Sequence, residues 1–315
     1  MSGKAGRVGV GPDATGGGLI GADELAVLEG DVQRALTSGR TDGLRVLGHG
    51  EITLVLGWPP EDPQVACKRL PPFRDATAAR RYLGVITDAL AMLRAGGVDV
   101  VDTELHHLPA PHGRVVGWAV QPILEPATLG PAVLRAEPPS DTHPMLEAVV
   151  AAVFGVCSPR VGLDAQCSNW AWDGRRLRYL DVTTPFLWDD RDRLLLDLDT
   201  LVAALPAPMR AVTKRLVAGD VIRKYRRPRD VLVDLCGNLL KERLDQWVPA
   251  WVEAANRRLV PAGAAPITEG EVRRFYRGDA RLWAVMLAAR RLDAWWQRRI
   301  RRRPYPFLLP GRIER

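Results

Sequence analysis

The sequence predicts an α+β protein of two lobes, in which a small antiparallel sheet comes first and a larger helical part follows. Three observations predict this fold class. First, β-rich runs separated by glycine and proline turns lie between residues 44 and 124. Second, apolar residues at helical spacing dominate after residue 145, and third, a short hairpin interrupts this helical part. The length of 315 residues and the hydrophobic fraction of 47% suffice for two cores. We expect a disordered tail at 1–21, an N-lobe at 22–124 and a helical C-lobe at 125–315.

The composition predicts a cytoplasmic protein without structural zinc or disulfides. No apolar run is long enough to span a membrane, and the N-terminal residues lack the apolar core of a signal peptide. The four cysteines are scattered, with no CxxC pair and no nearby histidine at ligand spacing. The net charge of +7 indicates an anionic partner, and a nucleotide, a nucleic acid or a membrane surface would each satisfy it.

The first segments are a tail and a helix. Residues 1–21 are rich in glycine and poor in apolar residues, so they cannot support a packed core. Apolar residues in 22–36 recur at the spacing of a short amphipathic helix, which we expect to end at Ser38-Gly39.

Three β-rich runs follow between residues 44 and 70, and their short turns predict an antiparallel meander. The first turn holds Gly48, His49 and Gly50. Glycines at such a turn let backbone amides approach a phosphate closely, and the histidine would contact the phosphate too. The alternative is an ordinary hairpin turn with an exposed histidine.

Lys68 stands inside the apolar third run, Val65-Ala66-Cys67-Lys68. Beside a glycine turn, a lysine there reaches nucleotide phosphates as a point charge. The alternative is a lysine on a solvated face of the strand. Apolar spacing then predicts a helix at 76–94, closed by Gly96-Gly97, and two further strands at 98–105 and 114–124.

The candidate catalytic and metal-binding residues are Asp164, Asn169 and Asp181. The first two have DxxxxN spacing, and the Asp173-Gly174 turn between two apolar runs predicts a hairpin that returns Asp181 towards Asn169. An amide oxygen and a carboxylate are hard ligands suited to Mg²⁺, while Asp164 can orient or deprotonate a hydroxyl. This is the layout of a phosphoryl-transfer site. The alternative is that these residues only cap turns.

The remaining sequence predicts a helical lobe. Helices are expected at 145–156, 194–205, 209–217 and 229–247. A capping-box pattern at Thr268 predicts the start of another helix, and a last long helix is expected from Asp279 to about Arg299.

The arginine-rich segment 271–315 has two interpretations. Apolar positions of its helix trace one face, which predicts core packing: Leu282, Val285, Met286, Ala289, Leu292 and Trp296. Alternatively, its arginines and aromatic rings bind nucleic acid, or Arg298–Arg303 meet an anionic substrate or membrane surface.

The order of glycine turn, V-A-x-K strand, DxxxxN, hairpin and aspartate resembles the protein-kinase-like superfamily over roughly residues 40–190. It is most similar to the aminoglycoside phosphotransferase and small-molecule kinase branch. The resemblance implies a bilobal fold, ATP and Mg²⁺ as cofactors, and a small-molecule acceptor that the sequence does not identify. It implies these roles: phosphate covering by Gly48 and Gly50, phosphate pairing by Lys68, catalytic base Asp164, Mg²⁺ ligands Asn169 and Asp181, and adenine-edge contacts from the backbone near Gln121 and Ile123.

The chain departs from that family at several positions. Gly162-Leu163 replaces the His-containing triplet before the base, and Val182 follows Asp181 where the family has Phe-Gly. The helix at 76–94 has no glutamate to pair with Lys68, since Asp88 is its only acid. We therefore expect a phosphotransferase acting on a hydroxyl. The alternatives are a pseudokinase or nucleotide-binding partner protein without turnover, and a basic nucleic-acid-binding protein.

Overall fold

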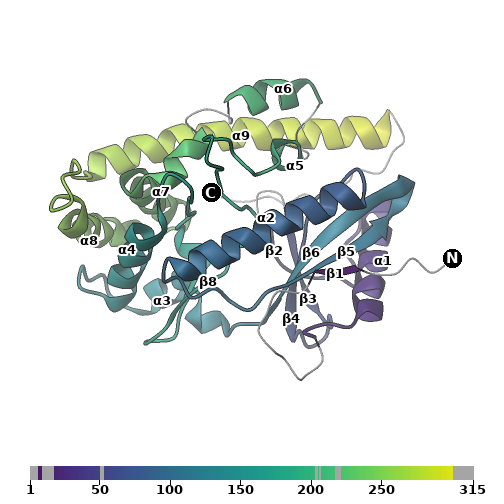
Figure 1. Cartoon of the computed structure of the whole chain (residues 1–315), viewed down its shortest axis with the longest axis horizontal. Helices are drawn as coiled ribbons and strands as arrows, with labels where there is room; N and C mark the ends of the chain where they lie inside the picture. Colours follow the sequence, from purple (N-terminus) through teal and green to yellow (C-terminus); the bar gives the residue numbers. More distant parts are fainter. Residues whose placement is uncertain are drawn as a thin grey trace.

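The structure is a computed structural model that describes residues 6–8, 18–49, 53–202, 205, 207–216 and 221–300. It consists of an antiparallel sheet lobe at one end of the molecule and a helical lobe that begins at the other end and sends its last, long helix along the whole length (Figure 1). A helix follows the third strand of the meander, and the helical lobe carries a two-stranded hairpin. This confirms the predicted α+β fold class and its division into a small antiparallel-sheet N-lobe and a larger, mainly helical C-lobe.

The sheet has six antiparallel strands in the order β1-β5-β6-β4-β3-β2. The strands are β1 Gly6–Val8, β2 Arg45–His49, β3 Leu54–Trp58, β4 Val65–Arg69, β5 Glu104–Ala110 and β6 Arg114–Pro122. The predicted meander is confirmed by β2, β3 and β4. Within the segment predicted to be a disordered tail, β1 pairs with β5, and the amide of Leu19 donates to the Glu104 carboxylate.

The prediction of a strand at 98–105 is wrong in its position, because the corresponding strand of the sheet, β5, begins only at Glu104. The preceding apolar residues join the two lobes instead. The amide of Val101 donates to the carbonyl of Tyr179 at 3.1 Å, and the Tyr179 amide donates to Asp99 at 2.8 Å. Val98 and Val100 are buried in the core that both lobes share, so their apolar character reflects this junction.

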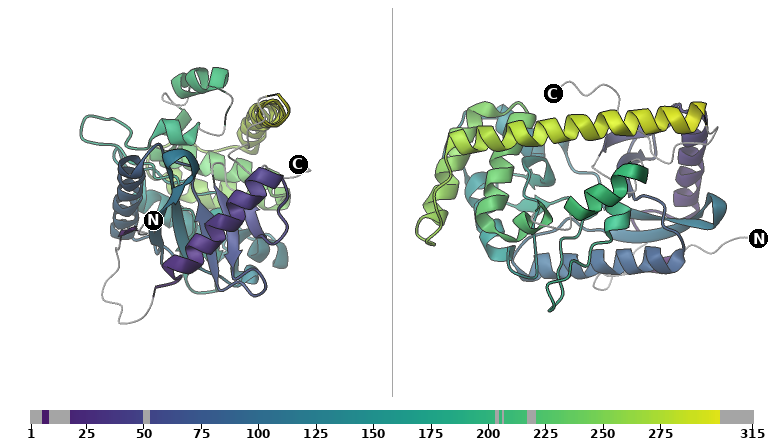
Figure 2. Two further views of the ribbon diagram at one scale, coloured as in Figure 1. Left: turned by 90° about the vertical axis from the view of Figure 1, so that its right-hand side faces the viewer. Right: turned by 90° about the horizontal axis from the view of Figure 1, so that it is seen from above.

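Helices α1 (Ala22–Ser38) and α2 (Ala76–Ala95) cover opposite faces of the sheet (Figure 2). On β6, Trp118 packs with α1 residues such as Leu28, whereas its neighbour Ala119 packs in the cluster that contains α2. Successive residues of a strand point to opposite faces, and Lys68 pairs with Ala119. The alternation therefore directs Lys68 towards α2 and the helical lobe.

The helical lobe begins after β6. Its helices are α3 Gly130–Ala136, α4 Pro144–Val156, α5 Leu198–Leu201, α6 Ala207–Leu216, α7 Pro228–Lys241, α8 Val248–Leu259 and α9 Glu269–Arg299. Its hairpin consists of β7 Trp170–Trp172 and β8 Leu177–Tyr179. Short 3₁₀ turns lie in this lobe at Pro126–Thr128, Cys167–Asn169, Lys224–Arg226 and Asp245–Trp247, and between β5 and β6 at Pro111–Gly113. None of the helices in these described ranges combines the length and apolar content needed to cross a bilayer.

Three of the predicted helices differ from the structure. The helix expected at 194–205 is reduced to the four residues of α5, because Leu194 pairs with Trp188 in an isolated bridge and the Asp197 side chain accepts the Asp199 amide as a cap. The helix expected at 229–247 stops at Lys241, because Arg243 takes a left-handed conformation with φ 58° and the Leu244 amide turns back to the Leu239 carbonyl. Asp279 does not cap a separate helix, since it lies inside α9, which has 31 residues in all. The cap predicted at Thr268 is confirmed: its hydroxyl accepts the Glu271 amide at 3.2 Å.

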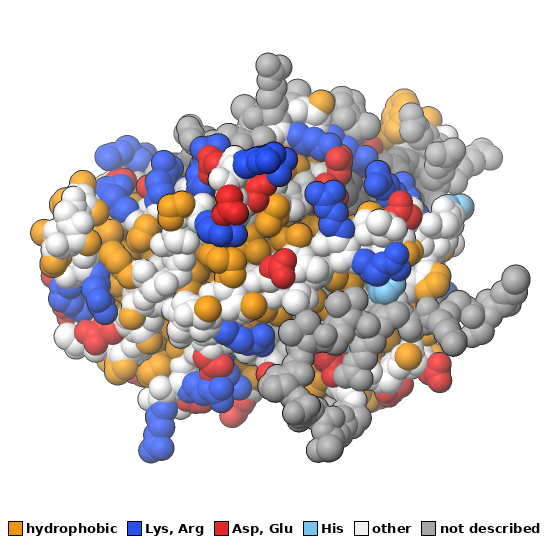
Figure 3. Space-filling view, viewed as in Figure 1, with side chains coloured by type: hydrophobic (Ala, Val, Ile, Leu, Met, Phe, Trp, Pro, Cys, Tyr) orange, Lys and Arg blue, Asp and Glu red, His pale blue; other side chains and the backbone are white. Residues whose placement is uncertain are grey.

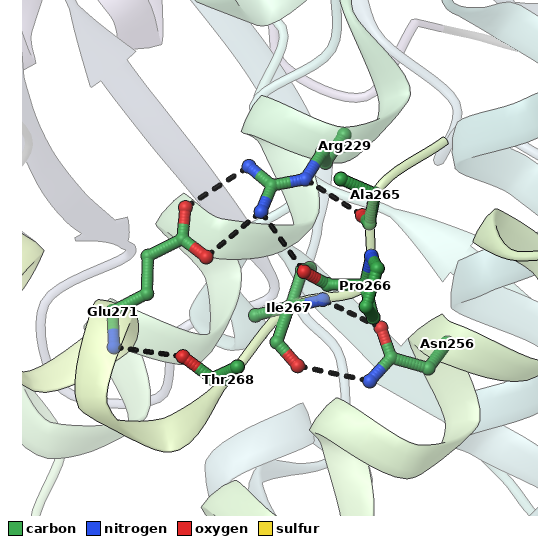
Figure 4. A network of polar contacts seen from close by, with 7 residues as sticks. All are labelled: Arg229, Asn256, Ala265, Pro266, Ile267, Thr268 and Glu271. Carbon is green, nitrogen blue, oxygen red and sulfur yellow. Dashed lines mark hydrogen bonds and ion pairs between the residues drawn. The ribbon is translucent and has the colours of Figure 1, made fainter. Parts of the chain in front are cut away.

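A polar network holds the start of α9 against α7 and α8 (Figure 4). The guanidinium of Arg229 makes two hydrogen bonds to the Glu271 carboxylate, at 2.9 and 2.8 Å, and donates to the carbonyl of Ala265. Asn256 both donates to the carbonyl of Ile267 and accepts its amide. This bidentate geometry fixes the point from which α9 runs along the length of the molecule (Figures 1 and 2).

Candidate phosphoryl-transfer site

The carbonyl oxygen of Leu180 joins the sheet lobe to the hairpin. It accepts a hydrogen bond from Nζ of Lys68 at 2.6 Å and another from Nε2 of Gln121 at 3.1 Å. Gln121 is buried and also donates to the hydroxyl of Thr103. Leu180 directly precedes Asp181, so neighbouring strands β4 and β6 both hold the start of the segment that carries this carboxylate.

The loop of Asp164 is tied to the same hairpin. Nδ2 of Asn169 and the hydroxyl of Tyr179 each donate to the backbone carbonyl of Asp164 at 3.1 Å. The amide of Leu180 donates to the Asn169 carbonyl at 2.8 Å. The structure thus brings together the three residues predicted from the sequence as the catalytic base and the metal ligands: Asp164, Asn169 and Asp181. The Asp164 carboxylate is further held by the side-chain amide of Gln166 at 3.0 Å.

Asp181 is oriented by Thr183, and Thr183 is held in turn by Tyr82; sequence reasoning assigned neither residue a role. Oδ1 of Asp181 accepts the amide and the hydroxyl of Thr183, at 3.2 and 3.0 Å. The hydroxyl of Tyr82, on α2, donates to the Thr183 carbonyl at 2.9 Å. Tyr82 fell on the predicted apolar stripe, and nothing in that pattern reveals the polar contact of its hydroxyl.

Burial and the charge of Asp181 set the local electrostatics. Burial lowers the pKa of Lys68, and the nearby Asp181 carboxylate opposes part of that shift. Burial raises the pKa of Tyr82 well above its ordinary value, and the charge of Asp181 raises it further. The site therefore holds its lysine in surroundings that disfavour the charged form.

No carboxylate from α2 pairs with Lys68 in the described part of the chain. Asp88, the only acid of the predicted helix, lies exposed on α2. The lysine contacts the neutral carbonyl of Leu180 instead. Lys68 is thus held by a backbone contact that crosses from the sheet to the hairpin.

Gly162, two residues before Asp164, lies where a side chain would meet the surrounding chain. The amide of Gly162 donates to the Phe186 carbonyl at 2.8 Å, and that of Leu163 donates to Tyr225 at 3.0 Å. A Cβ on Gly162 would lie 3.0 Å from both the Phe186 Cβ and the Tyr225 carbonyl oxygen. The two rings stack with centroids 4.2 Å apart. Tyr225 lies in a basic stretch far along the chain, and no sequence signal connected it with this loop.

The glycine turn is described only in part. Gly48 lies in β2 and pairs with Val55, beside an irregularity in the register, and a Cβ there would meet no atom within 4 Å. The His49 side chain and Gly50 fall outside the described residues. The phosphate-covering role of these three residues stays a prediction.

The adenine-edge contacts also stay a prediction. The amide of Ile123 donates to the Gln64 carbonyl at 3.0 Å, and the Gln121 side chain turns inward to Leu180. A base at this linker would therefore have to displace the Ile123 bond or use other backbone groups.

Two oxygens of the site fit a Mg²⁺ ion. Among the described residues, no hydrogen bond reaches Oδ1 of Asn169 or Oδ2 of Asp181, because Asn169 is anchored through Nδ2 and Asp181 through Oδ1. The described chain holds no cluster of three or more His, Cys, Asp or Glu side chains placed around a metal. A pair of oxygen ligands suits Mg²⁺, which keeps several waters and takes phosphate oxygens from its substrate.

A narrow crevice opens beside these carboxylates. Asp164 and Asp181 line it together with the apolar side chains of Leu90 and Leu93 from α2 and Phe186 from the segment after Asp181. The two acids are therefore within reach of a common small volume.

The sequence matches a known family over most of its length. Residues 27–294 match the profile of a family described as "Family of unknown function (DUF6206)". No curated protein matches the chain. The chain is similar to a solved structure described as "WaaP in complex with acyl carrier protein", with a TM-score of 0.37 and 17% identity, over 82% of this chain and 95% of that chain. By the extent of the profile match, the chain belongs to the DUF6206 family.

Proposed function

We propose that the protein is an ATP- and Mg²⁺-dependent phosphotransferase that acts on a hydroxyl of a small molecule, in the manner of the aminoglycoside phosphotransferase branch. The observation that carries the proposal is the junction at Leu180, where Lys68 reaches the residue before Asp181 at 2.6 Å while Asn169 is bonded to the loop of Asp164. Lysine, base and metal-ligand candidates from four separate segments converge there.

In this proposal, Asn169 and Asp181 hold Mg²⁺, which supplies charge neutralisation at the phosphates when it is bound. Lys68 binds phosphate oxygens as a point charge. Its pKa is lowered by burial, so an anionic partner would restore its preference for the charged form. Thr183 fixes the carboxylate of Asp181 in one orientation.

Asp164 orients the acceptor hydroxyl and takes its proton. Its carboxylate is positioned by Gln166, which donates at 3.0 Å from the side chain and at 3.3 Å from the backbone. A base must lie within hydrogen-bond reach of the proton that it removes. Asp164 and Asp181 line the same crevice, so the proposed base and the proposed metal ligand lie side by side.

A nucleotide-binding protein without turnover is the second candidate. It is favoured by the missing glutamate on α2, which leaves Lys68 bound to a neutral carbonyl. Both candidates require the nucleotide cleft, and only transfer to an acceptor separates them.

Consumption of ATP with a panel of alcohols and aminoglycosides tests the enzymatic proposal. Asp164→Asn should lower the rate by about 10²- to 10⁴-fold while ATP still binds. Asp173→Asn is the matched control, because this exposed aspartate accepts amides of the hairpin turn and has no place in the site. ATP binding without transfer to any acceptor would support the second candidate. Equal turnover in Asp164→Asn and the control would refute Asp164 as the base.

A further inference from the structure

The last turns of α9 expose an apolar face. The exposed fractions are 65% for Leu292, 51% for Trp295, 47% for Trp296 and 53% for Ile300. Their spacing of three, four and eight residues places them on one side of a helix. The opposite side is the buried one and includes Ala294. The prediction that Leu292 and Trp296 belong to the core is therefore wrong.

This face lies at the surface and no element of the described chain covers it. In Figure 3, hydrophobic side chains are visible at the upper right, where Figure 1 draws the C-terminal part of α9. Monomeric proteins seldom leave large side chains together on a surface without a binding role. The face thus requires a partner, and its charges indicate which kind.

Arginine accompanies the apolar face. Arg299 is exposed, and at 100° per residue it projects between Trp295 and Leu292. Arg291 is exposed at the edge of the face, and Arg301–Arg303 follow in the sequence. A second copy of the chain on this face would bring like charges together, which is unfavourable. An anionic partner satisfies both the arginines and the apolar groups.

We propose that this segment, Arg291–Ile300, docks on an anionic lipid bilayer. A helix that lies in the membrane interface buries its apolar side at the boundary of headgroups and acyl chains, and its arginines meet lipid phosphates. Tryptophan is enriched at that depth. Leu292 and Ile300 favour lipid over nucleic acid, because aliphatic side chains offer bases no stacking surface.

Co-sedimentation with vesicles tests the docking of the full chain. Vesicles that mix phosphatidylglycerol with phosphatidylcholine should bind the wild type, and vesicles of phosphatidylcholine alone should bind it at least about tenfold more weakly. The double variant Trp295→Ser, Trp296→Ser should lose about tenfold or more in affinity, and Arg299→Glu should lose binding selectively on the anionic vesicles.

Matched controls are available elsewhere on the surface. Val27→Ser removes an apolar side chain that is 54% exposed on α1, and Arg273→Glu reverses an exposed charge on the first turns of α9. Both should bind like the wild type, and thermal unfolding should show that every variant folds.

Three results would overturn the proposal. The first is equal vesicle binding by the wild type and the tryptophan variant. The second is binding to a single-stranded oligonucleotide but not to anionic vesicles. The third is a stable dimer, seen by analytical ultracentrifugation, that the tryptophan substitutions dissociate, because the face would then be an interface between copies.

Discussion

The ammonium of Lys68 donates a 2.6 Å hydrogen bond to the carbonyl oxygen of Leu180, which connects the sheet lobe to the residue before Asp181. A charge held by a neutral acceptor in a half-buried position is costly, and desolvation accordingly lowers the pKa of this lysine. Stability and nucleotide binding are therefore expected to place opposite demands on Lys68.

Lys68→Met should leave the protein at least as stable as the wild type near neutral pH while weakening ATP binding. A lysine whose pKa is lowered in the folded state reduces the free energy of unfolding by the full amount at pH values below that lowered pKa. This destabilisation fades as the pH rises towards 10.5, the ordinary pKa of lysine. The advantage of the methionine variant should therefore shrink between pH 7 and pH 10, as measured by urea unfolding. A variant that is less stable at pH 7 would contradict this account.

Tyr82→Phe should weaken Mg²⁺ binding without touching a metal ligand. The substitution leaves the buried carbonyl of Thr183 without its donor, at a cost of about 1–3 kcal/mol, and loosens the residue that orients Asp181. Unfolding and Mg²⁺-dependent ATP binding measure the two effects. Lost stability with unchanged Mg²⁺ affinity would show a purely structural role.

Tyr82 also predicts a dependence on alkaline pH. Its pKa is raised in the folded state, so above its ordinary value of about 10 the unfolded chain ionises while the folded protein does not. Stability should fall as the pH rises past 10, and less steeply in Tyr82→Phe than in the wild type. Identical slopes in urea unfolding would oppose this assignment.

Gly162→Ala should disturb the loop of Asp164. The new Cβ would lie 3.0 Å from Phe186 and from the Tyr225 carbonyl, so the paired backbone must move. We expect a loss of about 1–3 kcal/mol of stability together with reduced transfer activity. The control is Gly84→Ala within α2, where a Cβ meets nothing within 4 Å and should stabilise the helix by about 0.5–1 kcal/mol.

Glu29→Ala should be among the more destabilising substitutions in the sheet lobe. Glu29 of α1 makes a buried bidentate pair with Arg69, at 2.8 Å for both bonds, and its removal would leave a buried charge at a cost of about 3–5 kcal/mol. Asp42→Ala, which breaks an exposed pair with Arg40, should change urea unfolding little. The double variant Glu29→Met, Arg69→Met should recover most of the loss.

Local patterns in the sequence were sufficient to predict the meander, the hairpin and the convergence of Asn169 and Asp181. Each depends on neighbouring residues: glycine at a turn, alternation along a strand and the Asp173-Gly174 turn. The supporting residues could not be found in this way. Tyr82 and Tyr225 reach the site through contacts across about 100 and 60 positions of the chain, respectively, and their own neighbourhoods show only helical and basic patterns.

Apolar periodicity misled in two places for the same reason. Val98 and Val100 indicated a sheet strand, and Leu292 and Trp296 indicated a core-facing helix side. Periodicity reports that a face is apolar and does not report what covers it. In the first case the cover is the other lobe, and in the second it is absent from the described chain.

Calorimetry of ATP binding, with and without Mg²⁺, tests the central claim most directly. The wild type should bind ATP in a manner that requires Mg²⁺, Asp181→Asn should lose the Mg²⁺ dependence, and Lys68→Ala should bind more weakly in both conditions. No ATP binding by the wild type in either condition, or an unchanged Mg²⁺ dependence in Asp181→Asn, would contradict the assignment of a nucleotide site at the junction of the two lobes.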